Sequence, residues 1–368
     1  MDNSLDRLTI RGFKSIRALE DFQLGNLNVF IGGNGAGKSN LLEFFRLLRA
    51  VIDGRLVQYI SDGGGVSDFL FNGRKTTAQM EFETHFGPRG YRFAIKPGPL
   101  ENALLTDEAR YYKYSQNGWW QLGDSPNGTS LLVKEVRSNS PDGKYSQPVY
   151  AAIASWQVYH FHDTSATAAM RHYEIIQDNR VLRFNAANIA PYLLRLRAEH
   201  PDAYGEILNA VQLVLPFFDD FLLEATPFGE AQKVNLSWRQ KGSDYPLQPY
   251  HLSDGSLRFI CLATALLQPV PPATIVIDEP ELGLHPYAIA LLAELIQNAA
   301  QRTQLLVATQ SPALIDQFSI EDIVVVNRKE GASTFERLQE KDFNVWLESY
   351  SVGELWTKNV LSGGPVYE

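Results

Sequence analysis

Two short β-rich runs open the chain, at residues 8–14 and 27–31, and a polar connection separates them. Both runs are rich in the branched and aromatic side chains that pack well on a half-buried strand. After the second run the spacing changes, because apolar residues recur at helical intervals over residues 40–49. The predicted order at this end of the chain is therefore strand, loop, helix.

The middle of the chain is first β-rich and then helical. Short alternating runs separated by Gly, Pro, Asn and Ser predict strands, and they occupy residues 79–86, 91–95, 131–136 and 155–161. Leucines and alanines then follow at helical spacing over residues 186–214, with prolines near the expected helix starts. We expect a β-rich lobe followed by a small helical segment.

The last third of the chain alternates strands with helices. An extended segment at residues 228–239 precedes a helix expected over residues 256–267, which three nearby prolines end. A strand at residues 274–277 follows, and strand and helix then alternate to about residue 327. This alternation is typical of a doubly wound α/β sheet.

The loop that joins the strand at residues 27–31 to the helix at residues 40–49 has a phosphate-binding pattern, Gly32-x-x-x-x-Gly37-Lys38-Ser39. Glycines let backbone N–H groups converge on phosphate oxygens, and the helix start adds its positive dipole end. Lys38 supplies charge for the β- and γ-phosphates, and the Ser39 hydroxyl can ligate Mg²⁺. A Gly-rich turn of no function is the weaker alternative, because a strand precedes the loop and a helix follows it. The loop residues expected to bind ATP are Asn34, Gly35, Ala36, Gly37, Lys38, Ser39 and Asn40.

An acidic pair, Asp278 and Glu279, follows the strand at residues 274–277. This position is the carboxyl end of a parallel strand, where ligands of α/β folds bind. Asp278 is expected to hold Mg²⁺, and Glu279 to take or orient a proton of the attacking water as the general base. The alternative, two acids that cap the following turn, is weaker in a chain that also has a P-loop. The pair therefore predicts hydrolysis of ATP rather than binding alone.

Further segments make the chain similar to a known family. Residues 252–256, LSDGS, resemble the ABC-type signature, and residues 278–286 resemble Walker B followed by a D-loop. Residues 308–312, ATQSP, occupy the switch position, and residues 11–15 read RGFKS. Together these segments resemble the SMC/RecF/OLD-like branch of the ABC-type ATPases, specifically its short "predicted ATPase" members.

The resemblance covers the two ends of the chain and matches the middle loosely. It implies a P-loop NTPase fold, an ABC-type head with a mixed sheet, a β-rich lobe and a small inserted helical segment. Residues 1–75 and 226–368 would form an ATPase core split in sequence, residues 76–165 a β-rich lobe continuous with it, and residues 166–225 the helical insertion. Neither the long coiled-coil arm of SMC proteins nor the nuclease domain of OLD proteins is expected, because the chain offers no sustained heptads and too few residues for either.

The resemblance also implies a head-to-tail homodimer that forms when ATP binds, in which the signature of one subunit closes over the P-loop nucleotide of the other. Ser253 and Gly255, at the start of the helix at residues 256–267, would then contact the nucleotide of the partner. A serine N-cap at Ser253 is compatible with this role.

Two residues depart from the pattern of the family. Asp254 stands where ABC transporters have glycine, so its carboxylate must point away from the γ-phosphate or the contact across the dimer is weakened. Gln310 stands where many relatives have histidine, and it is assigned with Glu279 and Lys38 to the catalytic residues. Because an amide cannot carry a proton, we expect slow ATP turnover.

Composition and charge narrow the choice of function. With 45% hydrophobic and 20% charged residues the chain belongs among globular proteins. Its net charge of −9 argues against a surface coated in basic residues for nucleic acid. A local basic groove stays open as an alternative to a solvated helix face. The candidates for such a groove are Arg180, Arg183, Arg195 and Arg197.

The lack of a secretory signal and of a membrane span predicts a cytoplasmic protein. No apolar run approaches the ~20 residues that cross a bilayer, and the acidic, polar N-terminus is unlike a secretory signal. The single Cys261 is expected to be a buried thiol.

For His160, His162 and Asp163 three interpretations remain open: a metal site, a polar contact at the nucleotide or the dimer interface, or ordinary packing.

The leading interpretation is an ATPase head that acts in DNA repair, DNA sensing or defence against foreign DNA, with an effector such as a nuclease as partner and DNA as a candidate ligand. An alternative is an ATP-dependent regulatory scaffold that controls a partner protein without binding DNA. A third, the ATPase subunit of a membrane transporter, is disfavoured by the extra lobe and by the RecF-like start of the chain.

Overall fold

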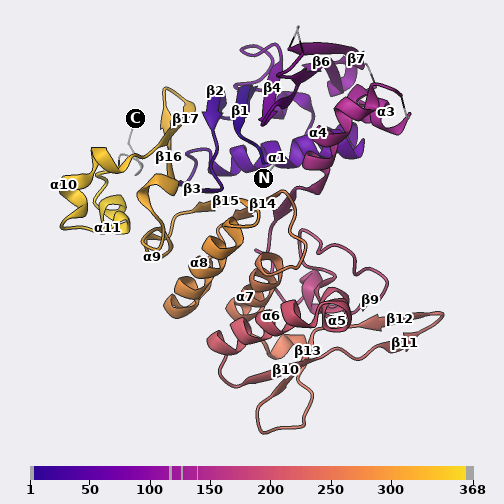
Figure 1. Cartoon of the computed structure of the whole chain (residues 1–368), viewed down its shortest axis with the longest axis vertical. Coiled ribbons are helices and arrows are strands. Elements are labelled where there is room, and N and C mark those ends of the chain that lie inside the picture. Colours follow the sequence, from indigo (N-terminus) through magenta and orange to yellow (C-terminus); the bar gives the residue numbers. More distant parts are fainter. Residues whose placement is uncertain (1–3, 116–117, 126, 139, 362–368) are drawn as a thin grey trace.

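The computed structural model describes residues 4–115, 118–125, 127–138 and 140–361. Two six-stranded sheets and the helices on them form one part of the molecule, and a mainly helical part with two small sheets extends from it (Figure 1). The last helices of the chain form a separate group on one side (Figure 1). Among the described residues, no helix is long and apolar enough to cross a membrane.

The central sheet is mixed, with five parallel strands and one antiparallel edge strand. From one edge to the other it consists of β17 (Ala332–Arg337), β16 (Ile323–Lys329), β3 (Leu27–Ile31), β15 (Gln304–Thr309), β14 (Thr274–Asp278) and β8 (Gln157–Tyr159). The carboxyl ends of parallel strands meet at one edge of a sheet. The loops after β3, β8, β14 and β15 therefore come together there.

Alternate residues of these buried strands face two different cores. Phe30 of β3 packs in the core that contains helix α1 (Lys38–Asp53). Val29 and Ile31 face the opposite core, which contains α7 (Asp254–Leu266) and α8 (Pro286–Ala300). Strands that are buried on both faces read as continuous apolar runs, and this is why β3, β14 and β15 could be predicted from the sequence.

The second large sheet is antiparallel and lies on the α1 side of the molecule (Figure 1). In order across the sheet its strands are β2 (Ile16–Gln23), β1 (Arg7–Phe13), β4 (Met80–Phe86), β5 (Arg89–Pro97), β6 (Ala103–Tyr112) and β7 (Trp119–Ser125). The helices α2 (Leu56–Asp62), α3 (Leu131–Arg137) and α4 (Gly143–Ser155) accompany it. The segment between the first two predicted strands is itself a strand, β2, which its exposed charged residues concealed.

One predicted strand, at residues 131–136, is wrong, because this run forms α3. The Ser130 hydroxyl caps the helix by accepting a hydrogen bond from the Val133 backbone. The buried carboxylate of Glu108, which comes from β6, accepts from the backbone N–H groups of Leu131 (2.7 Å) and Leu132 (3.2 Å). A carboxylate at a helix start is stabilising, and a distant residue supplies it, so the local sequence could not show it.

The part of the molecule away from the large sheets contains the predicted helical segment and more. It consists of α5 (Ile189–Glu199), α6 (Pro201–Val214), β10 (Phe218–Leu222) paired with β13 (Ser237–Gln240), and a sheet of β11 (Thr226–Phe228), β12 (Ala231–Val234) and β9 (Glu174–Ile175). Helix α6 contacts α7 and α8, so this part is packed on the central sheet through them. Burial raises the pKa of the Cys261 thiol on α7.

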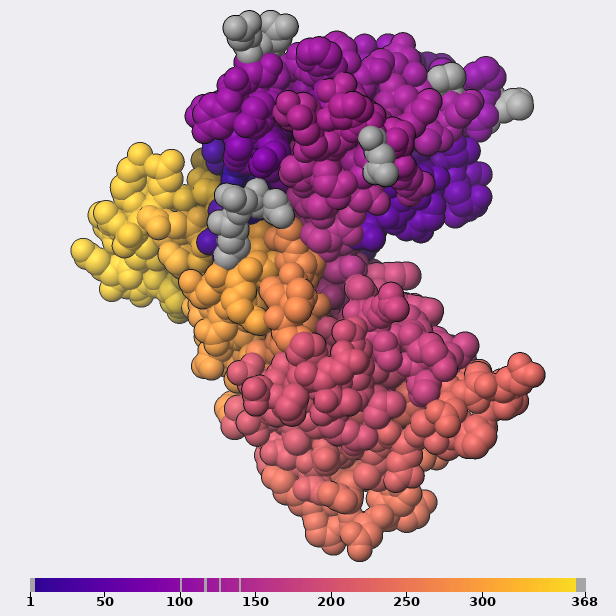
Figure 2. All heavy atoms as spheres, turned by 45° about the vertical axis from the view of Figure 1, so that its right-hand side comes forward, coloured from indigo at the N-terminus to yellow at the C-terminus, as the bar shows by residue number. Residues whose placement is uncertain are grey.

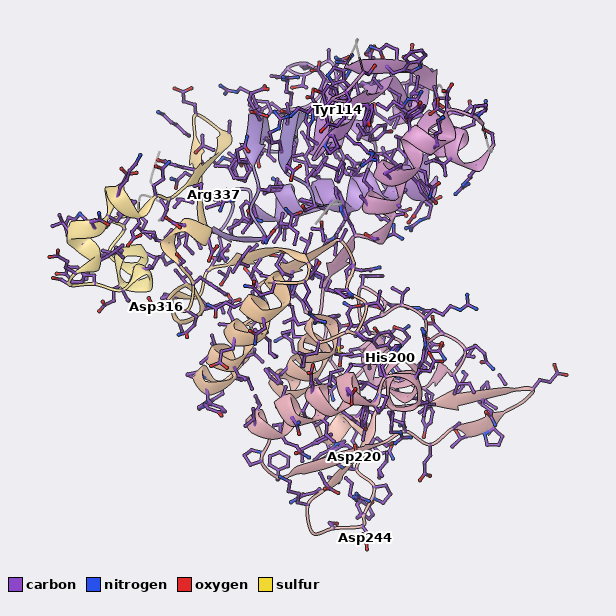
Figure 3. The ribbon with its side chains drawn as sticks, in the orientation of Figure 1. Tyr114, His200, Asp220, Asp244, Asp316 and Arg337 are labelled. Atoms are coloured by element: carbon purple, nitrogen blue, oxygen red, sulfur yellow. The ribbon has the colours of Figure 1, made fainter. Side chains whose placement is uncertain are left out.

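Two short helices end the described chain, α10 (Asn344–Leu347) and α11 (Val352–Thr357). The second of them, α11, packs on α9 (Pro312–Ile315), the short helix that follows β15. Asp316, which is labelled in Figure 3, accepts a hydrogen bond from the Gly353 backbone at 2.5 Å. The described 3₁₀ helices are Val66–Phe69, Pro99–Glu101, Ala169–Arg171, Pro249–His251, Ile320–Asp322 and Glu340–Asp342.

Candidate nucleotide-binding site

The Gly-rich loop runs from the end of β3 to the start of α1, as a phosphate-binding loop requires. Gly37 precedes the helix with φ of 116°, a conformation that L side chains rarely adopt. A side chain at Gly37 would collide with Ser333, and one at Gly32 with the carbonyl oxygen of Val326. The loop is therefore so tightly packed that only glycine fits at these two positions.

Lys38 points back into its own loop. Its Nζ donates hydrogen bonds to the carbonyl oxygens of Gly32 (2.6 Å) and Gly33 (3.3 Å), and the residue is 6% exposed. Burial lowers the pKa of Lys38, and the nearby carboxylates, Glu279 foremost, act in the opposite direction. The loop thus holds a cation where the β- and γ-phosphates of a nucleotide would lie.

The two predicted magnesium ligands lie side by side. Asp278 is the last residue of β14, and its Oδ2 is 3.4 Å from the Oγ of Ser39 on the first turn of α1. Burial raises the pKa of Asp278, and His162 acts against this shift. A carboxylate and a hydroxyl are the hard oxygen ligands that Mg²⁺ takes when it also keeps water and phosphate oxygens. The side chains present therefore fit a bound Mg²⁺.

Glu279 adopts a strained backbone conformation at the next position. Its φ is 41°, in the left-handed region, and its N–H donates to the carbonyl oxygen of Ala308 on β15 (2.8 Å). Non-glycine residues in this region are uncommon and concentrate at functional sites. The turn aims the two acids differently, so the carboxylate of Glu279 accepts from Gln310 rather than from the turn that follows.

Gln310 connects two of the loops at this edge. Its Nε2 donates to Oε1 of Glu279 (2.8 Å) and to Oδ1 of Asn34 in the Gly-rich loop (2.8 Å). The structure thus brings together the three predicted residues Asn34, Glu279 and Gln310 from separate parts of the sequence. An amide that holds a carboxylate in this way positions a base without taking its proton.

Glu281 supports this arrangement, although no role was predicted for it. It is largely buried, which raises its pKa, and its carboxylate accepts from the Thr309 hydroxyl and the Gln310 backbone N–H (3.4 Å). These bonds tie the turn after β14 to the turn after β15. Its place in the acidic run after a buried strand was the available signal.

The segment that contains His160 and His162 reaches the same edge because β8 is parallel to β14. The Nε2 of His162 lies 2.8 Å from the carbonyl oxygen of Asp278, and the rings of the two histidines are 4.1 Å apart. Asp163 instead accepts from Ser165. Within the described parts of the chain, no three His, Cys, Asp or Glu side chains are arranged to hold a metal ion. The geometry favours a polar contact at the nucleotide site for His162.

Asn40, another predicted nucleotide contact, takes part in a serine network behind the loop. Its Nδ2 donates to the Oγ of Ser15 (2.7 Å), which lies 2.6 Å from the Oγ of Ser333. The Ser333 hydroxyl donates to the carbonyl oxygen of Ala36 (2.6 Å). The segment at residues 11–15 therefore braces the Gly-rich loop from outside.

The signature-like segment begins α7, and its residues Ser253 and Asp254 are exposed. Ser253 is the N-cap of the helix and accepts from the Ser256 N–H (3.2 Å). A side chain at Gly255 would collide with the carbonyl oxygen of Gly283, so the D-loop-like turn packs directly on the signature. Among the hydrogen bonds of the described residues, none joins Ser253 to the Gly-rich loop of the same chain.

Asp254 is held by an arginine that the sequence did not reveal. Its carboxylate accepts from Arg171 (2.8 Å), and this guanidinium also donates to the carbonyl oxygens of Thr164 (2.9 Å) and Pro249 (2.6 Å). The Arg171 side chain is 8% exposed, so the pair is partly buried. This positive partner offsets the negative charge that Asp254 brings to the start of α7.

The candidate basic groove is largely neutralised. Arg183 pairs with Asp178 (2.6 Å), and Arg195 pairs with Glu199 (2.6 Å). Arg197 donates to backbone carbonyl oxygens. These arginines stabilise their own lobe and do not present an open row of positive charge.

Comparison with known proteins gives one family match and several similar folds. A family model described as "AAA domain, putative AbiEii toxin, Type IV TA system" matches residues 27–316. No curated protein matches the chain.

Solved structures of SMC heads share the fold at low sequence identity. An SMC head bound to the C-winged helix domain of ScpA is 16% identical, with a TM-score of 0.57, and the match covers 93% of this chain and 99% of that one. A Pyrococcus furiosus Smc head with an extended coiled coil, bound to the C-terminal domain of ScpA, is also 16% identical. Its TM-score is 0.54, and the match covers 94% of this chain and 98% of that one.

Proposed function

We propose that this protein is a slow ATPase that dimerises on ATP and signals to a partner effector. The chain belongs to the family described as "AAA domain, putative AbiEii toxin, Type IV TA system" and has the fold of an ABC-type SMC head without a coiled-coil arm. The observation that carries this proposal is the convergence of Asn34, Glu279 and Gln310 beside the Ser39–Asp278 pair. A protein that only binds ATP would not need a second carboxylate, Glu279, held apart from the Mg²⁺ ligand Asp278.

Each residue at the site has one task in this proposal. Lys38 and the loop N–H groups bind the phosphates, and Ser39 and Asp278 would hold Mg²⁺. Bound Mg²⁺ would neutralise charge on the phosphates. Glu279 orients the attacking water and accepts its proton. Gln310 keeps Glu279 in place, and its inability to carry a proton is consistent with slow turnover.

The exposed start of α7 supports dimerisation. Ser253 is exposed and Gly255 is partly exposed at this helix N-terminus, and such a terminus binds anions. The resemblance to ABC-type heads assigns the bound phosphate to a second copy, and among the described residues no hydrogen bond joins Ser253 to the Gly-rich loop of its own chain. The pairing of Asp254 with Arg171 leaves the terminus able to accept negative charge.

We expect Ser253→Arg to abolish ATP-dependent association, because it places bulk and charge in the shared site. ATP binding to each monomer should stay largely intact, since Ser253 lies outside the Gly-rich loop. Light scattering with ATP and Mg²⁺, done in the Glu279→Gln background to preserve the ATP state, measures the association. Ser243→Arg, next to Asp244 at the far tip of the molecule in Figure 3, is the matched control. Unchanged association in Ser253→Arg would rule out the shared site.

The biological role proposed is in DNA repair, DNA sensing or defence against foreign DNA. The family description names a type IV TA system, which supports an effect that depends on a partner. The neutralised arginines favour the second candidate, a regulatory scaffold that acts on a protein without binding DNA. The SMC heads of similar fold are themselves bound to a protein, ScpA.

DNA binding distinguishes these two roles. We expect any binding to be weak and to fall as salt rises, because the chain carries a net charge of −9 and only a local patch can contact phosphates. Electrophoretic shifts at about 50 and 200 mM salt measure this, with a slope near −0.9 per phosphate contact for a duplex. Tight binding that salt does not alter would contradict the expectation, and no binding at low salt would favour the scaffold.

A further inference from the structure

A cavity of about 540 Å³ lies beside α1 and the edge strand β8. Its walls come from the second half of α1, from the residues around β8, and from Arg183 and Phe184. Residues near 150–185, magenta in Figure 2, cross the narrow waist between the upper and lower parts of the molecule. The volume is within the ~300–1,000 Å³ of small-ligand sites, and no residue of the Gly-rich loop lines the cavity.

The wall of this cavity is rich in guanidinium groups. It contains four arginines and two carboxylates, and Arg183 also pairs with Asp178 (2.6 Å) and Glu174 (3.4 Å), which lie outside the wall. The four arginines are Arg46, Arg49, Arg55 and Arg183, and the two carboxylates are Glu43 and Asp53.

The two carboxylates are shared among several donors. Glu43 accepts from Arg46 (3.2 Å) and from the Tyr59 hydroxyl. Asp53 accepts from Arg49 (3.0 Å) and Arg55 (2.7 Å). Because each guanidinium has five N–H groups, donors remain for an anion.

The cavity also offers apolar and aromatic surface. Ala50 and Val158 line it, and the Phe184 ring is 59% exposed. Two polar atoms of its wall residues, Nε1 of Trp156 and Nδ1 of His160, are buried and have no hydrogen-bond partner among the described residues. Both atoms are enclosed by the protein, so the polar contacts to a ligand in the cavity would come from the arginines instead.

We propose that this cavity binds a phosphorylated nucleoside, either a free mononucleotide or the 5′-phosphorylated end of a nucleic-acid strand, as a second ligand apart from the P-loop nucleotide. Arginine forks match phosphate oxygens in pairs, and an exposed aromatic ring gives a base a surface on which to stack. Lysine, a point cation, would not bind phosphate oxygens in pairs. The described wall contains arginines and no lysine.

Two histidine rings connect the cavity to the candidate nucleotide-binding site. His160 lines the cavity and lies against His162, whose Nε2 is 2.8 Å from the carbonyl oxygen of Asp278. An effect of the second ligand on hydrolysis through these rings rests on the proposed function, but its binding does not. The experiment therefore measures binding.

Calorimetric titration of the protein saturated with a non-hydrolysable ATP analogue and Mg²⁺ tests the proposal. The probes are thymidine 5′-monophosphate and hexathymidylate with or without a 5′-phosphate. Binding of the monophosphate identifies a free nucleotide as the ligand. Binding of the 5′-phosphorylated strand alone identifies a strand end, with the unphosphorylated strand at least about tenfold weaker because it lacks the charge-assisted bonds.

The variants Arg46→Gln and Arg183→Glu should each weaken the bound probe about tenfold or more. Arg180→Glu, an exposed arginine outside the cavity and three residues from Arg183, should bind like wild type. The same titration is repeated with Lys38→Ala protein, which should not bind ATP. Binding of the probes to this variant would show that the cavity is a site of its own, even if the proposed ATPase function is wrong.

Three results would overturn the proposal. They are failure of every probe to bind, equal weakening by Arg180→Glu, and binding of a glutamate-rich peptide in place of both phosphorylated probes.

Discussion

Replacing Glu279 with glutamine is expected to slow ATP hydrolysis by ~10²–10⁴-fold, the usual contribution of general acid–base catalysis, while the affinity for ATP stays close to that of wild type. Glutamine has the shape of glutamate and can still accept the hydrogen bond from Gln310, so the strained turn should persist. It cannot take a proton from water. The neighbouring Asp278 is expected to be engaged by Mg²⁺ and therefore cannot substitute.

Single-turnover hydrolysis and calorimetric ATP binding, measured on the same preparation, separate these two effects. Glu294→Gln, on the exposed face of α8, is the matched control and should hydrolyse ATP at the wild-type rate. Normal hydrolysis by Glu279→Gln would show that another group is the base. The slowed variant should also accumulate as a dimer, because a persistent ATP state shifts the association equilibrium by mass action.

Replacing Lys38 with alanine is expected to reduce ATP affinity by about 100-fold or more and to abolish hydrolysis at ordinary ATP concentrations. Hydrogen bonds between charged groups contribute about 1.5–3 kcal/mol each, and the ammonium group can make two of them to phosphate oxygens. The fold should survive, since the bonds of Lys38 within the protein go only to carbonyl oxygens of its own loop.

Calorimetric titration with ATP checks the affinity, and thermal denaturation without nucleotide checks the fold. Lys75→Ala removes an exposed lysine away from the loop and serves as the control. If Lys38→Ala bound ATP as tightly as wild type, the Gly-rich loop would not be the nucleotide site.

The parts of the site that the sequence predicted are those whose residues act within a few positions of one another. The Gly-rich loop and the acids after β14 each follow a continuous apolar strand, and the edge of the sheet follows from that pattern. The bridge by Gln310 could be predicted only as far as its place in the switch segment. Its bond to Asn34 joins residues 276 positions apart, which no local pattern shows.

Residues with distant partners account for what the sequence did not reveal. Arg171 could not be linked to Asp254 from spacing, because 83 positions separate them. Residues 131–136 were expected to form a strand, but they form α3. The carboxylate that stabilises the start of this helix belongs to Glu108 of β6, which is distant in sequence. The charged residues of β2 resembled a polar connection, since most side chains of this edge strand are exposed.

The position of β3 at the middle of the central sheet has a consequence for biosynthesis. Both of its neighbours, β15 and β16, lie near the other end of the chain, and 273 positions (304 − 31) separate Ile31 from Gln304. At about 5–20 residues per second, the ribosome needs roughly 14–55 s to deliver the first neighbour. During that time the antiparallel sheet can pair locally, but both edges of β3 stay open. The nascent chain therefore presents its nucleotide-binding strand to chaperones for most of its synthesis.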